Sequence, residues 1–191
     1  MKRSLFLLLT PVMFGIYSCG NGNNDTTDMA DSMNEARVDA ADQYGQNAAF
    51  SEDDASFAVE AANGGLTEVE LGKLAQQKGS SQKVKDFGSM MVKDHGMAND
   101  ELKQLAAAKG ITLPTGPSEE KQRLINEMSA KSGADFDKAY LDEMVKDHRE
   151  DVRKFENASN SVKDPDLKAF VDRTLPVLRK HLEHVEGLNN K

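Results

Sequence analysis

The pentapeptide MVKDH occurs twice in this chain, at residues 91–95 and again at residues 144–148. Both copies lie in long segments whose apolar residues recur every three or four positions, which is the spacing of an amphipathic α-helix. The methionine and the histidine of each copy are four positions apart, so they share the apolar face of such a helix. The repeat therefore predicts two helices that each direct one histidine, His95 or His148, toward the protein interior.

The helical spacing continues on both sides of the repeat, and no alternating strand pattern of useful length interrupts it. Serine caps, glycines and prolines indicate where the helices begin and end. Gly64, Gly65 and Gly72 weaken the first long helix and are expected to allow close approach of a neighbouring helix. The expected elements are four long helices and one short one, at residues 52–78, 80–109, 118–133, 135–160 and 164–187.

The lengths of the connections predict how the helices pack. The first and second long helices are joined by very few residues, as are the third and fourth, so each pair should form an antiparallel hairpin. A longer connection at residues 110–133 carries the short helix between the two pairs. The sequence therefore predicts an all-α fold over residues 51–188, a ferritin-like four-helix bundle with a short crossover helix. An up-down-up-down bundle is the alternative.

The N-terminal stretch MKRSLFLLLTPVMFGIYSC, residues 1–19, has two basic residues followed by an apolar run that is too short to span a bilayer. Its end resembles a bacterial lipobox, and Cys19 is the only cysteine of the chain. We therefore expect residues 1–18 to be a lipoprotein signal peptide and Cys19 to carry a thioether lipid. The alternative is ordinary cleavage nearby that leaves Cys19 as a free thiol.

The segment after Cys19 is rich in Gly, Asn, Asp and Thr, with few apolar residues to bury. Residues 19–50 are therefore predicted to be the lipidated cysteine and a flexible linker, with at most a weak helix. The predicted location is the cell envelope, with the anchor in the outer membrane and the bundle facing the periplasm.

The formal charge of −8 excludes some classes of partner. Nucleic acid calls for clustered Lys and Arg, and anionic lipid headgroups attract basic surfaces, so neither partner fits this acidic chain. The protein is therefore expected to attach to the membrane only through the acyl chains of its lipid anchor. A protein partner and the oligomeric state are not indicated by the sequence.

The long helices each place one polar residue on the apolar face. These residues are Glu68, His95, His148 and His181, and His184 lies at the edge of the same face. Counting from the helix ends puts the four inward residues at similar heights. Imidazole and carboxylate groups suit Zn, Fe, Cu or Ni, so the sequence suggests one transition-metal ion in the bundle core. A buried hydrogen-bonded cluster of the same residues is the alternative interpretation.

A di-iron centre is not expected. Di-iron bundles place a glutamate three positions before each ligating histidine, whereas those positions hold Val92, Val145 and Leu178 here. Any site should therefore be mononuclear. Asp94 and Asp147 precede the repeat histidines and lie about 100° around the helix from them, so both are predicted to be solvated.

Four motifs carry a family resemblance: EVELGKLA at 68–75, VKDFGSMMVKDH at 84–95, FDKAYLDEMVKDH at 136–148 and LPVLRKHL at 175–182. Together they resemble the ferritin-like domain-of-unknown-function family of bacterial envelope proteins, often described as outer membrane proteins. The resemblance covers residues 51–188. It implies a ferritin-like bundle that is exported, frequently as a lipoprotein, and it implies no established activity or residue role.

The sequence thus suggests a lipid-anchored bundle that binds one metal ion, with binding or sensing favoured over catalysis. Two alternatives remain open. One is a metal-free envelope binding or stress-protective module, and the other is a mononuclear metal oxidoreductase.

Overall fold

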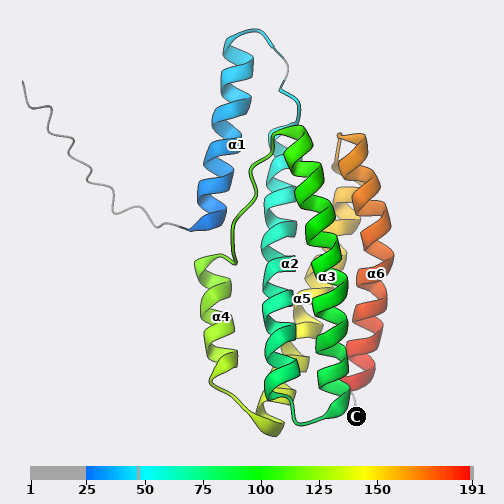
Figure 1. Cartoon of the computed structure of the whole chain (residues 1–191). Coiled ribbons are helices and arrows are strands. Elements are labelled where there is room, and N and C mark those ends of the chain that lie inside the picture. Colours follow the sequence, from blue (N-terminus) through cyan, green and yellow to red (C-terminus); the bar gives the residue numbers. More distant parts are fainter. Residues whose placement is uncertain (1–24, 47, 190–191) are drawn as a thin grey trace, which may run out of the picture.

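The computed structural model describes residues 25–46 and 48–189, which form six α-helices and contain no β-strand (Figure 1). The all-α class predicted from the sequence is therefore confirmed. Five of the helices match the expected elements closely, and one additional helix precedes them. The helices are α1 (Thr26–Gln43), α2 (Glu52–Lys78), α3 (Gln82–Lys109), α4 (Glu119–Ser129), α5 (Gly133–Ser161) and α6 (Pro165–Asn189).

The four long helices α2, α3, α5 and α6 form a bundle of two antiparallel hairpins. Helix α2 pairs with α3 and α5 pairs with α6, while α2 also packs against α5 and α3 against α6. Figure 1 shows that the crossover with α4 returns the chain to the end where α3 begins. Helices α3 and α5 therefore run in the same direction, which brings the two copies of MVKDH to similar heights.

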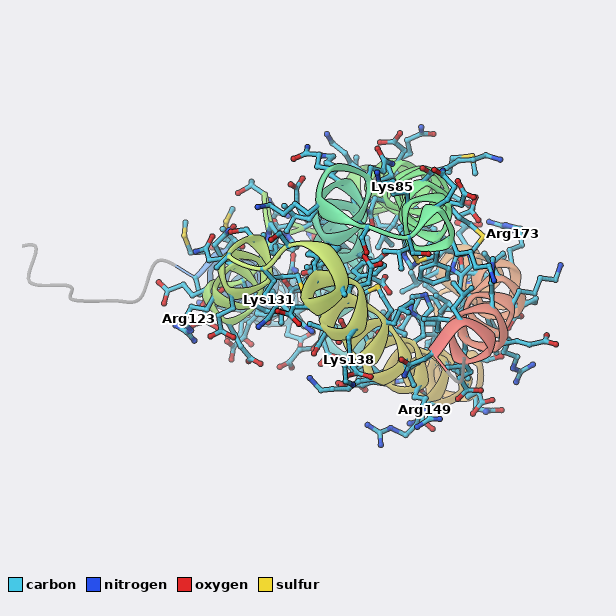
Figure 2. All side chains as sticks on the ribbon, turned by 90° about the horizontal axis from the view of Figure 1, so that it is seen from below. Lys85, Arg123, Lys131, Lys138, Arg149 and Arg173 are labelled. Atoms are coloured by element: carbon cyan, nitrogen blue, oxygen red, sulfur yellow. The ribbon has the colours of Figure 1, made fainter. Side chains whose placement is uncertain are left out.

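Helix α4 lies outside the four-helix arrangement, against α2 and α5. Figure 2 shows this along the bundle, with Arg123 on α4 and Arg149 on α5 pointing away from the centre. Ser118 caps α4 by accepting a hydrogen bond from Lys121 N. The crossover thus covers the side of the bundle that α2 and α5 form.

Two carboxylates connect the two hairpins at their ends. Asp54 on α2 is 2% exposed and accepts hydrogen bonds from the backbone N–H groups of Lys163 and Asp164, in the turn between α5 and α6. At the opposite end, Asp137 on α5 accepts hydrogen bonds from Ser80 N and Ser81 N, between α2 and α3. A carboxylate of each hairpin therefore binds backbone N–H groups in the turn of the other hairpin. These contacts fix the relative height of the two hairpins.

Replacing Asp54 by alanine is expected to lower the free energy of unfolding by about 2–4 kcal/mol, because two backbone donors lose a charged acceptor. Urea denaturation measures this change. Asp53→Ala, which removes an exposed carboxylate from the same helical turn, is the matched control and should change stability by less than about 0.5 kcal/mol. Equal effects of the two substitutions would contradict the proposed role of Asp54.

Glycines set the close spacing of α2 and α3. A Cβ atom on Gly72 would lie 2.7 Å from the carbonyl oxygen of Gly88, and a Cβ on Gly88 would lie 2.6 Å from the Cβ of Ala75. Neither position can accept a side chain without separating the helices. The close approach that the sequence predicts at Gly72 is present, whereas Gly64 has room for a Cβ atom.

The apolar core is divided into two clusters along the bundle. One surrounds Phe155 and Phe170, near the turn between α5 and α6. The other surrounds Phe87 and Tyr140, nearer the turn between α2 and α3. Both clusters draw on several helices and bury large side chains. The inward histidines belong to neither cluster and form a polar layer in the same bundle interior.

The prediction of a flexible linker over residues 19–50 is wrong for its described part, because residues 26–43 form α1. Helix α1 packs on α2, and Asn34 fastens it to the crossover. The Asn34 side chain donates to Thr112 O at 2.9 Å and accepts from Thr112 N at 2.7 Å. Apolar periodicity does not reveal this helix, because polar bonds hold it in place.

The predicted signal peptide at residues 1–18 and the predicted lipid site at Cys19 lie outside the described residues. Among the helices that the structure describes, none combines the length and apolar character that crossing a membrane requires.

Candidate metal centre

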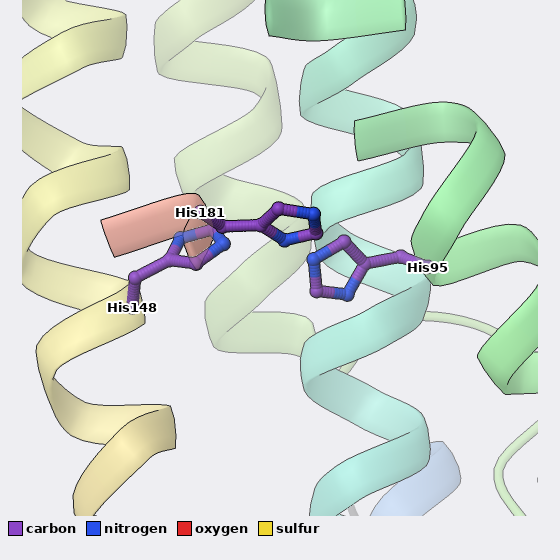
Figure 3. A group of neighbouring side chains, drawn as sticks. All are labelled: His95, His148 and His181. Carbon is purple, nitrogen blue, oxygen red and sulfur yellow. The ribbon is translucent and has the colours of Figure 1, made fainter. Parts of the chain in front are cut away.

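Three histidines from three helices meet in the bundle interior. His95 lies on α3, His148 on α5 and His181 on α6, and each offers one nitrogen within 4.8 Å of the other two. Their ring centroids are 5.3–5.6 Å apart. Figure 3 shows the three rings close together, with the ring of His181 between those of His148 and His95 in this view. All three side chains are buried, with exposed fractions of 6%, 0% and 2%.

The local sequence explains why the rings point inward. Met91 and Met144, one turn before His95 and His148, are fully buried. On each helix the lysine of the repeat is exposed. The apolar stripe therefore determines how α3 and α5 face the core, and the histidine follows the methionine by one turn.

One nitrogen of each ring has a partner outside the group of three. His148 Nδ1 donates a hydrogen bond to Met144 O at 3.0 Å, and His181 Nε2 bonds to Asp94 Oδ2 at 3.0 Å. His95 Nδ1 lies 2.7 Å from Glu68 Oε2. Because carbonyl and ionised carboxylate oxygens only accept, the contacts with Met144 O and Asp94 place the protons of His148 and His181 on their outer nitrogens, and the ionised form of Glu68 would do the same for His95.

The remaining nitrogens carry the lone pairs. They are His95 Nε2, His148 Nε2 and His181 Nδ1, which are buried and have no hydrogen-bond partner among the described residues. Neutral rings in these tautomers present only acceptors to one another, so they cannot pair among themselves. A cation at their centre would satisfy all three lone pairs at once.

Glu68 lies beside the three histidines. It is 2% exposed, and its other oxygen, Oε1, is 3.3 Å from His148 Nδ1. Its carboxylate thus faces the outer nitrogens of two rings, which is where the orienting partners of metal-bound histidines are found. His184, placed by the sequence at the edge of the site, is exposed and its ring lies 5.5 Å from that of Phe87.

Two aspartates that the sequence analysis treated as solvated have other roles in the structure. Asp94 bonds to His181, and Asp147 is 6% exposed with Oδ1 3.2 Å from Lys121 Nζ. The prediction is wrong because it considered each helix alone. Helix α6 covers Asp94, and α4 covers Asp147. The presence of aspartate before the histidine in both copies of the repeat was the available signal.

Burial sets the protonation of the site. It lowers the pKa of His95 and His148 to about 4, and it also lowers the pKa of His181. The three rings are therefore neutral at pH 7, which is the form that binds metal. Burial raises the pKa of Glu68 to about 7, because a charged carboxylate is poorly solvated there. A nearby cation would favour its ionised form.

The geometry suits a mononuclear site with three protein ligands. Bonds of about 2.0–2.1 Å from a zinc ion would place the three nitrogens about 3.4 Å apart. They now lie within 4.8 Å of one another, so small side-chain rotations would complete the site. Neutral imidazole suits Zn, Cu, Fe and Ni, and a fourth position would stay open to an external ligand.

Residues 39–188 match a family model described as "Domain of unknown function (DUF4142)". Among solved structures, the chain is similar to "Crystal structure of DUF305 fragment from Deinococcus radiodurans", with 12% sequence identity and a TM-score of 0.64. This similarity covers 74% of the present chain and 97% of the other, and it concerns the fold alone. No curated protein matches the sequence. Because the family match takes in the whole bundle, the chain belongs to the DUF4142 family of proteins with a domain of unknown function.

Proposed function

We propose that this protein binds one transition-metal ion, Zn, Fe, Cu or Ni, through His95, His148 and His181 at the centre of a ferritin-like bundle. The observation that carries this proposal is a group of three buried histidines that each offer a nitrogen within 4.8 Å of the other two. Each ring also has one buried nitrogen without a hydrogen-bond partner among the described residues. Buried polar atoms are rarely left without partners. A shared metal ion supplies one partner to all three, and it explains why their protons lie on the outer nitrogens.

The same observation opposes a metal-free hydrogen-bonded cluster. Such a cluster needs donors among the inward atoms, and His148 and His181 use their protons in contacts with Met144 O and Asp94. Glu68 and Asp94 act in this proposal as orienting groups that hold two of the rings and make their inner nitrogens more basic. The site is proposed to serve binding or sensing of the metal.

Cobalt binding tests the proposal directly. Chelator-treated protein titrated with Co²⁺ is expected to develop the visible d–d absorption of a low-coordinate site and to saturate at about one ion per chain. The site would be rejected if Co²⁺ produced no change in visible absorption and if calorimetric titrations with Zn²⁺, Cu²⁺ and Ni²⁺ released no heat.

Removal of the Asp94 carboxylate is expected to weaken metal binding about tenfold while leaving the fold intact. The Asp94→Ala variant loses the acceptor that orients His181, and loss of such outer partners typically costs 10–100-fold in affinity. Competition with a coloured chelator measures the change. Asp100→Ala, an exposed aspartate on the same helix, is the control, and equal affinities of the two variants would rule out an orienting role for Asp94.

We further propose that the protein is exported and anchored by a lipid on Cys19, in the outer membrane and facing the periplasm. The charged and apolar pattern of residues 1–18 supports this location. Because α1 begins at Thr26, six residues separate it from Cys19, and they reach at most about 25 Å. The bundle would therefore sit close to the membrane surface.

Fractionation tests this anchor. The full-length protein expressed in a Gram-negative host should pellet with membranes and release only with detergent. Cys19→Ser should move it to the soluble periplasmic fraction or block its processing. If Cys19→Ser protein of mature size remains in the membrane to the same extent as the parent, the lipid is not the anchor.

A further inference from the structure

A polar pocket of about 340 Å³ lies between α2, α4 and α5, and its lining includes Glu68, which lies beside His95 and His148. We call it the acidic pocket. Its walls carry the carboxylates of Glu60, Glu68, Glu120, Asp147, Glu150 and Asp151. Three lysines, Lys121, Lys146 and Lys154, also line it, so carboxylates outnumber ammonium groups two to one. A lining rich in carboxyl oxygens suits a hydrated divalent cation.

Asp147 is the feature of the acidic pocket that points to a ligand. Its side chain is 7% exposed, and Oδ1 contacts Lys121 Nζ at 3.2 Å. Its other oxygen, Oδ2, is buried and has no hydrogen-bond partner among the described residues. A buried carboxylate oxygen that lines a pocket without a donor is suited to hold a hydrated cation.

Asp151 and Glu68 line both the acidic pocket and a small cavity that also contacts His95. Asp151 lies one turn from Asp147 on α5, and its carboxylate lies beside Gly64 of α2. Glu68 lines both the acidic pocket and the histidine site, because its oxygens lie 2.7 and 3.3 Å from His95 and His148. A cation at Glu68 would therefore lie beside the rings of His95 and His148.

A second opening, a groove of about 250 Å³ between α3 and α6, reaches the site from the other side. Its walls include His95 and His181, but much of the remainder is apolar, from Met97, Val177 and neighbouring residues. Its acidic groups are engaged, since Asp94 bonds to His181 and Glu101 pairs with Arg173. A hydrated cation would meet apolar surface and a guanidinium there.

We propose that the acidic pocket is the entrance through which a hydrated divalent cation reaches the three histidines, and that Asp147 holds the ion on the way in. This inference rests on the proposed metal-binding function. It adds a transient cation site and a route that the histidine geometry alone does not define. Lys121, which contacts Asp147, acts as the positive group that an incoming ion displaces.

Stopped-flow uptake of Zn²⁺ or Co²⁺ by the chelator-treated protein tests the route. Asp147→Asn keeps the shape of the side chain and removes its charge, and the association rate should fall about tenfold. The dissociation rate should fall by a similar factor, because one opening serves both directions, so Kd changes little. Lys121→Met should accelerate association several-fold, since it removes the competing ammonium group.

Glu101→Gln is the matched control, because it removes one carboxylate from the groove between α3 and α6. Its association rate should equal that of the parent. A slower Glu101→Gln variant with an unchanged Asp147→Asn variant would place the entrance in that groove and overturn the inference. Loss of affinity through faster dissociation in Asp147→Asn would assign Asp147 a purely structural role, also against the inference.

The two proposals fail in distinguishable ways. If the parent protein takes up no metal at equilibrium, both the proposed function and the proposed entrance are wrong. If equilibrium binding is intact and Asp147→Asn, Lys121→Met and the parent associate at equal rates, only the entrance is wrong.

Discussion

Replacing His148 by alanine is expected to weaken the binding of Zn²⁺ or Co²⁺ by more than about a hundredfold. His148 is fully buried and would supply one of three protein ligands. Loss of an orienting partner alone costs 10–100-fold at such sites, so loss of a ligand should cost more. His95→Ala and His181→Ala should behave alike, because the three rings stand in equivalent positions around one centre. Competition with a chelator of known affinity measures all three.

The chain contains its own control for this experiment. It has four histidines, and the fourth, His184, is exposed and lies outside the group of three. His184→Ala should retain the parent affinity within about twofold. Circular dichroism should show helical spectra for every variant. If His148→Ala binds metal as tightly as His184→Ala does, the site is elsewhere or does not exist.

Metal binding is also expected to stabilise the fold strongly. A ligand that binds only the folded state adds about 2.7 kcal/mol at a free concentration one hundred times its Kd. For a chain of this size, each kcal/mol raises Tm by about 2–4 °C, so a rise of roughly 5–10 °C is expected. Differential scanning calorimetry of the chelator-treated protein, with and without added Zn²⁺, measures the shift.

Two comparisons separate this stabilisation from general effects of ions. The His148→Ala variant should show no rise in Tm with added Zn²⁺, and a chelator should return the parent protein to its lower value. A metal-free module predicts that neither the metal nor the chelator changes Tm. An equal rise in the parent and in His148→Ala would show that the ion acts at another place.

The bundle was predictable because its signals are local. Serine caps and glycines define the helix ends, and the expected first long helix at residues 52–78 coincides with α2. A short connection between two consecutive helices is enough to predict that they pack as an antiparallel pair. Helix α1 was missed because Asn34 and Thr112, 78 positions apart, hold it by polar bonds. Such a pairing leaves no periodic pattern in the sequence.

The histidines were predictable for the same reason, and their partners were not. A helical wheel places His95, His148 and His181 on apolar faces, and one site then follows from the parallel direction of α3 and α5. A helical wheel cannot show which carboxylate approaches a ring from a neighbouring helix. The sequence suggested Glu68 as a ligand, and its oxygens lie 2.7 and 3.3 Å from His95 Nδ1 and His148 Nδ1. Asp94 was predicted to be solvated, whereas it bonds to His181.

The central claim is that three inward nitrogens share one ion, and the metal content of the purified bundle tests it most directly. The protein should be refolded with Zn, Fe, Cu or Ni, desalted and measured by elemental analysis. At least one of these metals should remain at close to one equivalent per chain, and His148→Ala should retain almost none. Less than about a tenth of an equivalent of every metal in the parent protein, or equal retention by His148→Ala, would contradict the claim.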